Sequence, residues 1–409
     1  MSKKHILFKF YAVVLLFMAT PLLAGGLHDD IEFDTKLKLF ASKANVPNNF
    51  LSDYKAAYLK LDVDFAYHVN ENLSFNFLPY ARTSYYSIHR DKTQTDIKIW
   101  QAYLNYQINN FDFYLGRFDF VDERLAPFIY YGDNLSADLA LPTSLDGLKH
   151  KFTGKYIDYS LLLVQESQIE NDTKAKLSGT NITAKPLSWL NISGFYFYQN
   201  KKYSQNTDKI NSKLFVFGAG IDLFLTETSG LHFYGAKNGG EKETIKPSIT
   251  RQIPYKGYAF NGEFYSQNVY KTGILNNKLG FYVFSDKEKF YSFPNKLQTG
   301  IIYGGMNYDN VLPASPQIFY AILDFNFSKY SFLYSDLGVF VYSSGKDNIN
   351  NRNYYAKEIN LNVGFKFDTW GLKLSGGLFE GEALFLGGTT TEKQKIKKLQ
   401  ANLFYKFTL

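Results

Sequence analysis

The chain has 409 residues, of which 45% are apolar and 18% aromatic, and this excludes an intrinsically disordered protein. It contains no Cys, which excludes disulfide scaffolds and Cys-ligated zinc or iron–sulfur sites. The formal charge of +7 is not gathered into any basic run, so the sequence gives no case for a nucleic-acid partner.

The first 24 residues have the pattern of an export signal. Three lysines in the first nine residues precede an apolar stretch that ends at Leu23, and Ala24 followed by two Gly offers a small-residue cleavage site. A membrane anchor is the less favoured alternative, because the stretch is interrupted at Pro21 and is shorter than the roughly 18 residues that span a bilayer. We therefore expect a signal peptide over 1–24 and one mature domain over 25–409.

Beyond residue 30, apolar and polar residues alternate in one segment after another. In the segment 57–67 the odd positions are apolar, while Lys60, Asp62 and Asp64 fall between them; 355–367 has the same pattern. A period of two gives a β-strand one apolar and one polar face. No apolar stretch in this part of the sequence is long enough for a transmembrane helix.

Two kinds of connector separate the expected strands. Short ones have the composition of tight turns and lie at 70–72, 109–110, 186–188, 228–230, 328–329 and 368–371. Longer polar ones lie at 42–54, 89–95, 119–144, 200–211, 237–255, 343–353 and 380–394. Short turns on one rim and long loops on the other are typical of bacterial outer-membrane barrels.

The sequence motifs around the longest of these loops resemble the alginate-export family of outer-membrane proteins over about 97–165. The resemblance rests on Trp100 to Leu104, Leu115-Gly116-Arg117, Asp122-Glu123-Arg124-Leu125 and Leu145-Asp146-Gly147-Leu148. It implies an 18-stranded barrel with an Arg-rich conduit for a polyuronate chain. It also implies that Arg117 and Arg124 lie in or near the constriction, with Glu123 as a neighbouring carboxylate.

Two features depart from that family. Over 97–260 the only arginines are Arg117, Arg124 and Arg251, so lysine supplies most of the positive charge. Lysine lacks the planar fork that holds carboxylates in a bidentate manner. Arg117 also shares the parity of the apolar residues 111, 113 and 115, so either a bulge shifts the face or Arg117 lies at the rim above the lipid.

The sequence does not decide where the loop 119–144 lies. It could fold inward and narrow a pore, or it could cap the outer surface.

The last eleven residues, 399–409, alternate up to the end of the sequence. Leu399, Leu403, Tyr405 and Phe407 share one face, and Gln400 and Lys406 share the other. This resembles the terminal strand by which the insertion machinery of the outer membrane recognises its substrates, although the usual final Phe is here Leu409.

These patterns predict an all-β protein, a closed transmembrane antiparallel β-barrel in the outer membrane of a Gram-negative-type bacterium. Walking along the sequence gives about nineteen candidate strands, and length alone suggests 16–20. Both ends of the barrel domain should lie on the periplasmic side, which requires an even number, so we expect 18 and an error within 231–316. The alternative fold is a soluble β-sandwich or solenoid.

A barrel of this size holds water, so the expected function is a porin-like channel for polar or anionic solutes, including saccharides. The polar faces supply both signs of charge, through Glu32, Asp34, Lys36, Lys38, Lys60, Asp62, Asp64, Arg82, Lys149, Lys151, Glu358 and Lys366. From these, Arg82, Lys149, Lys151, Asp62 and Asp64 join Arg117, Glu123 and Arg124 as candidates for the pore lining.

The alternative functions are an exporter of an anionic polysaccharide, an adhesin and an enzyme. The six His lie in no motif that suggests a nucleophile or a metal site, so we expect no enzymatic activity and no cofactor. Asp62 and Asp64 share one face, but two carboxylates fall short of the 6–8 oxygens that Ca²⁺ prefers, and pairing with a basic residue is favoured. The expected partners are outer-membrane lipid, the insertion machinery and a small solute.

Overall fold

The computed structural model describes residues 31–45, 54–87, 91–131, 144–166, 174–205, 208–245, 250–285, 316–328, 330–344, 355–382 and 393–408. The strands are β1 (Ile31–Asn45), β2 (Tyr54–Asn70), β3 (Leu73–Ser87), β4 (Asp91–Ile108), β5 (Phe111–Phe118), β6 (Leu145–Thr153), β7 (Ile157–Glu166), β8 (Lys174–Leu187), β9 (Leu190–Gln205), β10 (Asp208–Thr226), β11 (Ser229–Ile245), β12 (Thr250–Pro254), β13 (Gly257–Tyr270), β14 (Gly273–Phe284), β15 (Pro316–Phe327), β16 (Leu333–Ser344), β17 (Tyr355–Lys366), β18 (Trp370–Glu382) and β19 (Lys393–Thr408). The predicted signal peptide lies outside the described residues.

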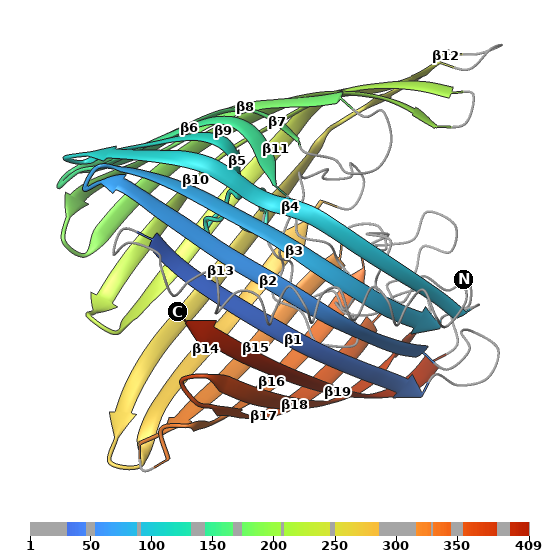
Figure 1. Cartoon of the computed structure of the whole chain (residues 1–409). Coiled ribbons are helices and arrows are strands. Elements are labelled where there is room, and N and C mark those ends of the chain that lie inside the picture. Colours follow the sequence, from blue (N-terminus) through green and yellow to red (C-terminus); the bar gives the residue numbers. More distant parts are fainter. Residues whose placement is uncertain are drawn as a thin grey trace.

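The strands form one closed antiparallel barrel (Figure 1). Each pairs with its neighbours in the chain, and β1 pairs with β19 to close the sheet. β12 and β13 both pair with β11, one above the other, so they are two parts of one interrupted strand. Counted in this way, the described part of the chain forms a barrel of 18 strands, which confirms the prediction.

The interruption between β12 and β13 has a local cause. Gly240 on β11 lies opposite the break with φ +110°, and its carbonyl accepts a hydrogen bond of 2.8 Å from the backbone N–H of Tyr255. A Cβ at Gly240 would lie 2.0 Å from the carbonyl oxygen of Lys213, so only Gly fits. The ambiguity that the sequence placed within 231–316 is this bulge.

One rim of the barrel carries tight turns and the other carries the long connections. Five of the predicted turns coincide with strand-to-strand turns, the sixth (328–329) lies partly outside the described residues, and Asn109 adopts the left-handed conformation (φ 53°) that Asn tolerates. The rim with short turns is the periplasmic one in such barrels. The predicted connectors 89–95, 200–211 and 237–255 are wrong in extent. β4, β9, β10 and β11 continue through most of them, because a strand beyond the lipid can be polar on both faces.

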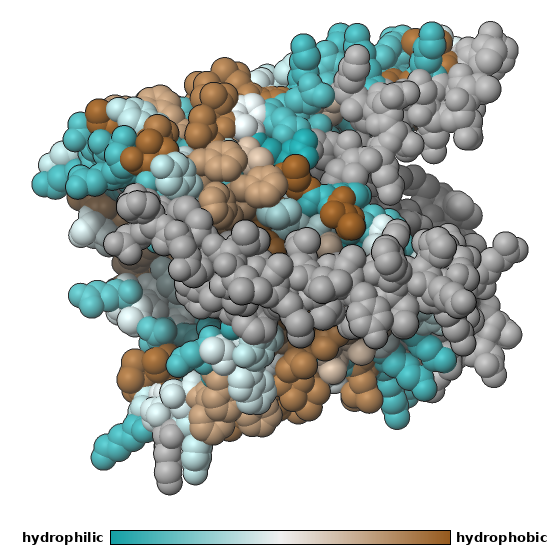
Figure 2. All heavy atoms as spheres, viewed as in Figure 1, coloured by the Kyte–Doolittle hydropathy of each residue, from teal (hydrophilic) through white to brown (hydrophobic). Residues whose placement is uncertain are grey.

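The outward face carries the apolar band that the alternation predicts. Leu115 is 58% exposed and Leu399 70%, and brown side chains cover the middle of the wall in Figure 2. Near the periplasmic rim Phe332, Phe367 and Trp370 stack with ring centroids 5.1 and 4.4 Å apart, as in the aromatic girdles of outer-membrane barrels. A closed sheet with this band is an outer-membrane structure, since a closed barrel is the form in which a sheet spans lipid.

Among the described residues, no helix has the length and apolar character needed to cross a membrane.

The wall has an uneven height, which positions the site. β5 has 8 residues and β4 has 18, and β5 pairs only with Ala102–Ile108 of β4. Within the described part of the chain, residues 91–101 of β4 therefore have a strand partner on the β3 side alone. Figure 1 shows β5, β6 and β7 ending well before β4 and the long β8–β11. The chain that leaves β5 thus turns inward from low on the wall.

Candidate functional site: the inner wall and its loop

The segment 119–131, the first part of the predicted loop 119–144, lies against the inner wall of the barrel. Two backbone hydrogen bonds between Phe120 and Tyr131, of 2.7 and 2.9 Å, close the segment on itself. Of the two positions that the sequence left open, this described part adopts the inward one, while 132–143 lie outside the described residues.

Apolar contacts hold the loop to the wall. The ring of Phe128 lies 5.4 Å from that of Phe195, and the ring of Phe120 lies 5.7 Å from that of Phe197, both on β9. The wall beneath is apolar where a water-filled lumen would favour polar residues, with buried Leu162, Val164, Leu177, Leu214 and Val216. Burying a large apolar side chain contributes about 1.5–3 kcal/mol, so these contacts supply most of the attachment.

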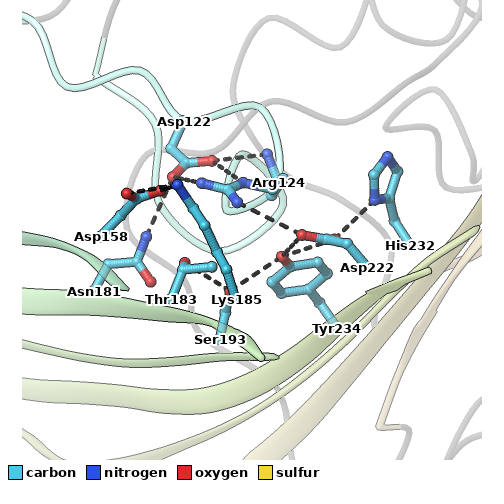
Figure 3. A network of polar contacts seen from close by, with 10 residues as sticks. All are labelled: Asp122, Arg124, Asp158, Asn181, Thr183, Lys185, Ser193, Asp222, His232 and Tyr234. Atoms are coloured by element: carbon cyan, nitrogen blue, oxygen red, sulfur yellow. Dashed lines mark hydrogen bonds and ion pairs between the residues drawn. The ribbon is translucent and has the colours of Figure 1, made fainter. Parts of the chain in front are cut away.

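A polar cluster fixes the tip of the loop (Figure 3). Arg124 donates to Asp122 beside it, and its guanidinium lies 3.5 Å from Asp222 of β10. Asp222 is 1% exposed; it accepts a hydrogen bond from the hydroxyl of Tyr234 at 3.0 Å and lies 2.8 Å from Nδ1 of His232. Burial lowers the pKa of Arg124, but the two carboxylates more than offset this and raise it overall, so the side chain stays cationic.

The wall beside this cluster continues the polar network toward the periplasm. Asn181 on β8 donates to Asp122 at 3.3 Å. Lys185 and Asp158 form an ion pair of 2.7 Å that does not touch the loop, and Figure 3 shows it next to the cluster. The loop is thus tied to β8, β10 and the apolar face of β9.

A second buried cluster anchors the far end of the segment. Tyr131 and Gln199 of β9 both donate hydrogen bonds to Oε1 of Glu166 on β7, and Lys201 lies 3.8 Å from the same carboxylate. Burial, followed by the neighbouring Glu166, raises the pKa of the Tyr131 hydroxyl, which therefore remains a proton donor. The two ends of the described segment are held by separate polar groups.

A cation lies where the loop leaves the wall. Nζ of Lys149 on β6 lies 4.0 Å from the ring centre of Tyr114 and 5.1 Å from that of Phe118. Burial raises the pKa of the Asp119 carboxyl above its ordinary value, and the charge of Lys149 opposes that rise. Lys149, a predicted pore residue, thus lies on the inward face beside the loop.

The half of the wall opposite the loop carries charges in strand register. Lys38, Lys60 and Arg82 are direct partners on β1, β2 and β3. Lys60 lies 3.0 Å from Asp62, and Arg82 lies 3.8 Å from Asp96 on β4. Because 18 strands close the barrel, β2 lies across the lumen from β11. Cations thus occupy the inner wall across from the loop; Lys38 is partly exposed, whereas Lys60 and Arg82 are buried beside their carboxylates.

The other predicted pore residues have these positions. Asp64 shares the inward face of β2 with Asp62, Lys151 shares that of β6 with Lys149, and Glu123 is exposed on the loop beside Arg124. Asp62 lies 3.0 Å from Lys60 of its own strand and 3.9 Å from Lys38 of the neighbouring strand β1. The described residues hold no group of three or more His, Asp or Glu suited to a metal ion.

Arg117 is not in the conduit. It shares the outward face of β5 with Phe113 and Leu115, and the β4–β5 register runs without a bulge. Its guanidinium donates to both carboxylate oxygens of Asp146 at 2.7 and 3.1 Å, and to the carbonyl oxygen of Ile99 at 3.2 Å. That carbonyl belongs to the stretch of β4 that has no strand partner on this side. Arg117 therefore donates a hydrogen bond to a backbone group at an open sheet edge.

Asp222, Tyr234, Glu166 and Gln199, which hold the loop, are not among the residues that the sequence patterns single out. A signal for them exists in the strands that are apolar on both faces, such as Leu161 to Val164 and Leu214 to Phe217. A strand that is apolar on both faces is expected to contact apolar surroundings on both sides of the sheet. In a barrel this means lipid outside and an inserted segment inside.

Comparison of the sequence with models of protein families and with curated proteins gives no match. Solved structures share the fold. OpdQ of Pseudomonas aeruginosa superposes with a TM-score of 0.59 at 11% identity and covers 93% of this chain and 100% of that one. OccK5 (OpdH) of the same organism superposes with a TM-score of 0.60 at 9% identity and covers 94% of this chain and 99% of that one. OccAB4 of Acinetobacter baumannii superposes with a TM-score of 0.57 at 11% identity and covers 93% of this chain and 98% of that one. These neighbours are outer-membrane porins of the OprD/Occ group.

The comparisons do not support the resemblance to the alginate-export family. No family model matches, and the neighbours in structure are porins of another group. The structure adds a physical reason, because Gly116 and Gly147 pair across β5 and β6 with φ +127° and +152°. The matching motif residues Leu115 to Arg117 and Asp146 to Leu148 flank this close strand contact, so they serve the wall rather than a conduit.

Proposed function

We propose that this protein is an outer-membrane channel that passes small polar solutes, with a preference for anionic ones, between the inward loop and the charged wall opposite. The observation that carries the proposal is the register row Lys38–Lys60–Arg82 on the inward face. Lys38 is partly exposed, while Lys60 and Arg82 are only 4% and 5% exposed and are paired with carboxylates, so the row would attract anions through the positive potential of the wall rather than by direct contact.

The loop supports the same proposal. Apolar contacts and the ion pair of Arg124 with Asp222 hold it to the wall, and Glu123 is exposed on it. A loop held against the inner wall takes up part of the lumen, which would select solutes by size. The neighbours in structure are channels, and this agrees with a transport function and not with an enzyme.

The test is the permeability ratio of the wild-type channel in planar bilayers under a salt gradient, compared with Lys38→Gln/Lys60→Gln. We expect the wild type to prefer Cl⁻ over K⁺ and the variant to lose about half of that preference or more, since two lumen charges are removed. The matched control is Lys43→Gln/Lys55→Gln, the same change on the outward faces of β1 and β2.

Unchanged selectivity in the Lys38/Lys60 variant would contradict the anionic preference. Absence of any conductance from a folded, heat-modifiable barrel would contradict the channel itself and favour an adhesin. Block of the current by a uronate oligomer, but not by a neutral oligosaccharide of equal length, would favour the exporter of an anionic polysaccharide instead.

We also propose that the terminal strand, residues 399–409, is the segment by which the insertion machinery recognises the protein. Its described part alternates between outward Leu399, Leu403 and Tyr405 and inward Gln400 and Lys406. β19 then pairs with β1, so the recognised strand is also the one that closes the barrel.

A further inference from the structure

A group of outward-facing lysines lies near the extracellular ends of β17, β19, β1 and β2, within a run of five neighbouring strands that also includes β18. Lys43 lies near the end of β1, and Lys55, Lys357, Lys395 and Lys397 lie near the starts of β2, β17 and β19. All five side chains are exposed, and all lie next to the long connections rather than the periplasmic turns. We call these five residues the outer lysine belt.

The belt lies directly above the lipid-facing band. Two residues further along β17, Ile359 is 47% exposed on the same face as Lys357, and on β19 Leu399 follows Lys397 in the same way. Leu39 lies below Lys43 on β1. A lysine at this level keeps its stem on apolar neighbours while the ammonium reaches the headgroups. In Figure 2 brown side chains on the lower part of the wall give way to teal ones at this rim.

Few carboxylates balance the belt. Glu380 on β18 pairs with Lys357 at 3.2 Å, and the charge of Lys395 acts on the same carboxylate. Lys43 and Lys55 are register partners, so two like charges lie side by side, which destabilises a sheet. Neither has an ion-pair partner within the part of the chain that the structure describes.

Other parts of the same rim differ. On β14, β15 and β16 the outward residues at this end are Val283, Gln317, Phe319, Val341 and Ser343. On β8–β10 outward Lys176, Lys202 and Lys213 also occur, but Lys213 is the register partner of Glu241 on β11. Lys209 of β10 is exposed on the same outward face, so the belt, from β17 through β19 to β2, is one of two groups of outward lysines on this rim, and the other lies beside Glu241 and Glu243 of β11.

We infer that the outer lysine belt binds the phosphate groups of a phosphorylated glycolipid in the outer leaflet, with its acyl chains on the apolar band below. An anionic headgroup supplies the charge that the belt lacks, and the adjoining band accepts the chains. A lipid fits better than a protein partner because charge and apolar surface lie at the depths where headgroup and chains lie in a bilayer.

The test measures binding of lipid A by native mass spectrometry of the full-length mature barrel released from detergent. The belt variant is Lys43→Gln/Lys55→Gln/Lys397→Gln, and the matched control is Lys176→Gln/Lys202→Gln/Lys213→Gln. Each lysine near an anionic surface contributes about fivefold in affinity, so we expect the belt variant to bind bis-phosphorylated lipid A at least about tenfold more weakly. The control should stay within about twofold of the wild type.

Three further arms can overturn the proposal. Lipid A without phosphates should bind weakly to the wild type; equal binding would mean that the acyl chains alone are held. Millimolar inorganic phosphate should not displace lipid A, and full displacement would show that a free anion suffices. Equal losses in belt and control variants would mean a non-specific charge effect. Heat-modifiability and wild-type conductance of both variants confirm folding, because all six side chains face outward.

Discussion

At the scale of single residues, position on the strand decides what a charge does. Arg117 and Arg124 are equivalent candidates in the sequence, since each belongs to a short motif at or next to the loop 119–144. Arg117 faces outward and donates to Asp146 and to the edge of β4, whereas Arg124 lies inside the barrel, where it joins the loop to Asp222 of the wall. Only the second belongs to the proposed conduit.

This distinction predicts opposite results for the same substitution. Arg124→Gln should shift the reversal potential toward cation permeation, because it removes a lumen charge. Arg117→Gln should leave the reversal potential unchanged and lower the melting temperature, since a partly exposed ion pair and one edge carbonyl are worth about 1 kcal/mol. A selectivity change in the Arg117 variant would show that its side chain reaches the lumen after all.

Asp119 makes the loop sensitive to pH. Burial raises the pKa of its carboxyl, so on acidification it takes up a proton at a higher pH than an ordinary Asp. The folded pKa is the higher one, so Asp119 favours the folded state most below its ordinary pKa, and this contribution is lost as pH rises through the folded pKa.

The expected consequence is measured in the channel. As pH falls from 7 through that pKa, the site beside Lys149 loses a negative charge, and anion preference should rise. Asp119→Asn should remove this part of the pH dependence and show the higher preference already at pH 7. If the pH profile of Asp119→Asn equals that of the wild type, another group titrates.

At the scale of elements, the loop segment 119–131 is held by two kinds of contact with different roles. The apolar contacts with Phe195 and Phe197 stabilise the loop against the wall, but they do not fix its exact position because hydrophobic contacts are not directional. The polar contacts of Arg124 with Asp222 and of Tyr131 with Glu166 fix where along the wall the loop sits. Removing one polar contact should therefore loosen the loop rather than release it.

Asp222→Asn tests this. The substitution keeps the shape but removes the charge that holds Arg124, at a cost of about 1–3 kcal/mol to loop attachment. We expect faster amide hydrogen exchange in 119–131 and larger fluctuations of the open-channel current. The control is Asp158→Asn, which breaks the Lys185 ion pair on the same wall without touching the loop. Equal exchange protection in both variants would show that apolar packing alone places the loop.

At the scale of the whole molecule, closure is the cooperative step. β19 pairs with β18 on one side and with β1 on the other, so it takes part in two of the strand pairings that close the barrel. Without it, two strand edges would be left unpaired in lipid, where each unsatisfied backbone group costs several kcal/mol.

Deletion of 399–409 should thus abolish the folded barrel altogether. We expect no heat-modifiable band and no membrane-inserted protein, either on refolding into vesicles or in cells. Removal of Leu409 alone is the control and should leave refolding into vesicles intact while slowing assembly in cells, if the terminal residue is read by the insertion machinery. A folded barrel from the longer deletion would show that β18 can close directly on β1.

The sequence by itself determined the strands, the turns and the closed barrel, because the two-residue period and the turn residues are local properties that each strand carries. It also indicated the even number of strands, and its one ambiguous segment is the Gly240 bulge. The inward faces of Lys60, Arg82 and Lys149 follow from the same parity.

Only the tertiary structure decided where the loop lies and which charges meet. Asp222 and Arg124 are 98 positions apart, and whether they touch depends on how low β5 ends and on which wall is apolar inside. The position of Arg117 also needed the register, since parity alone allowed a bulge that would have turned it inward. The physical reason is that alternation fixes a residue's face, while contacts across a lumen depend on the shape of the whole wall.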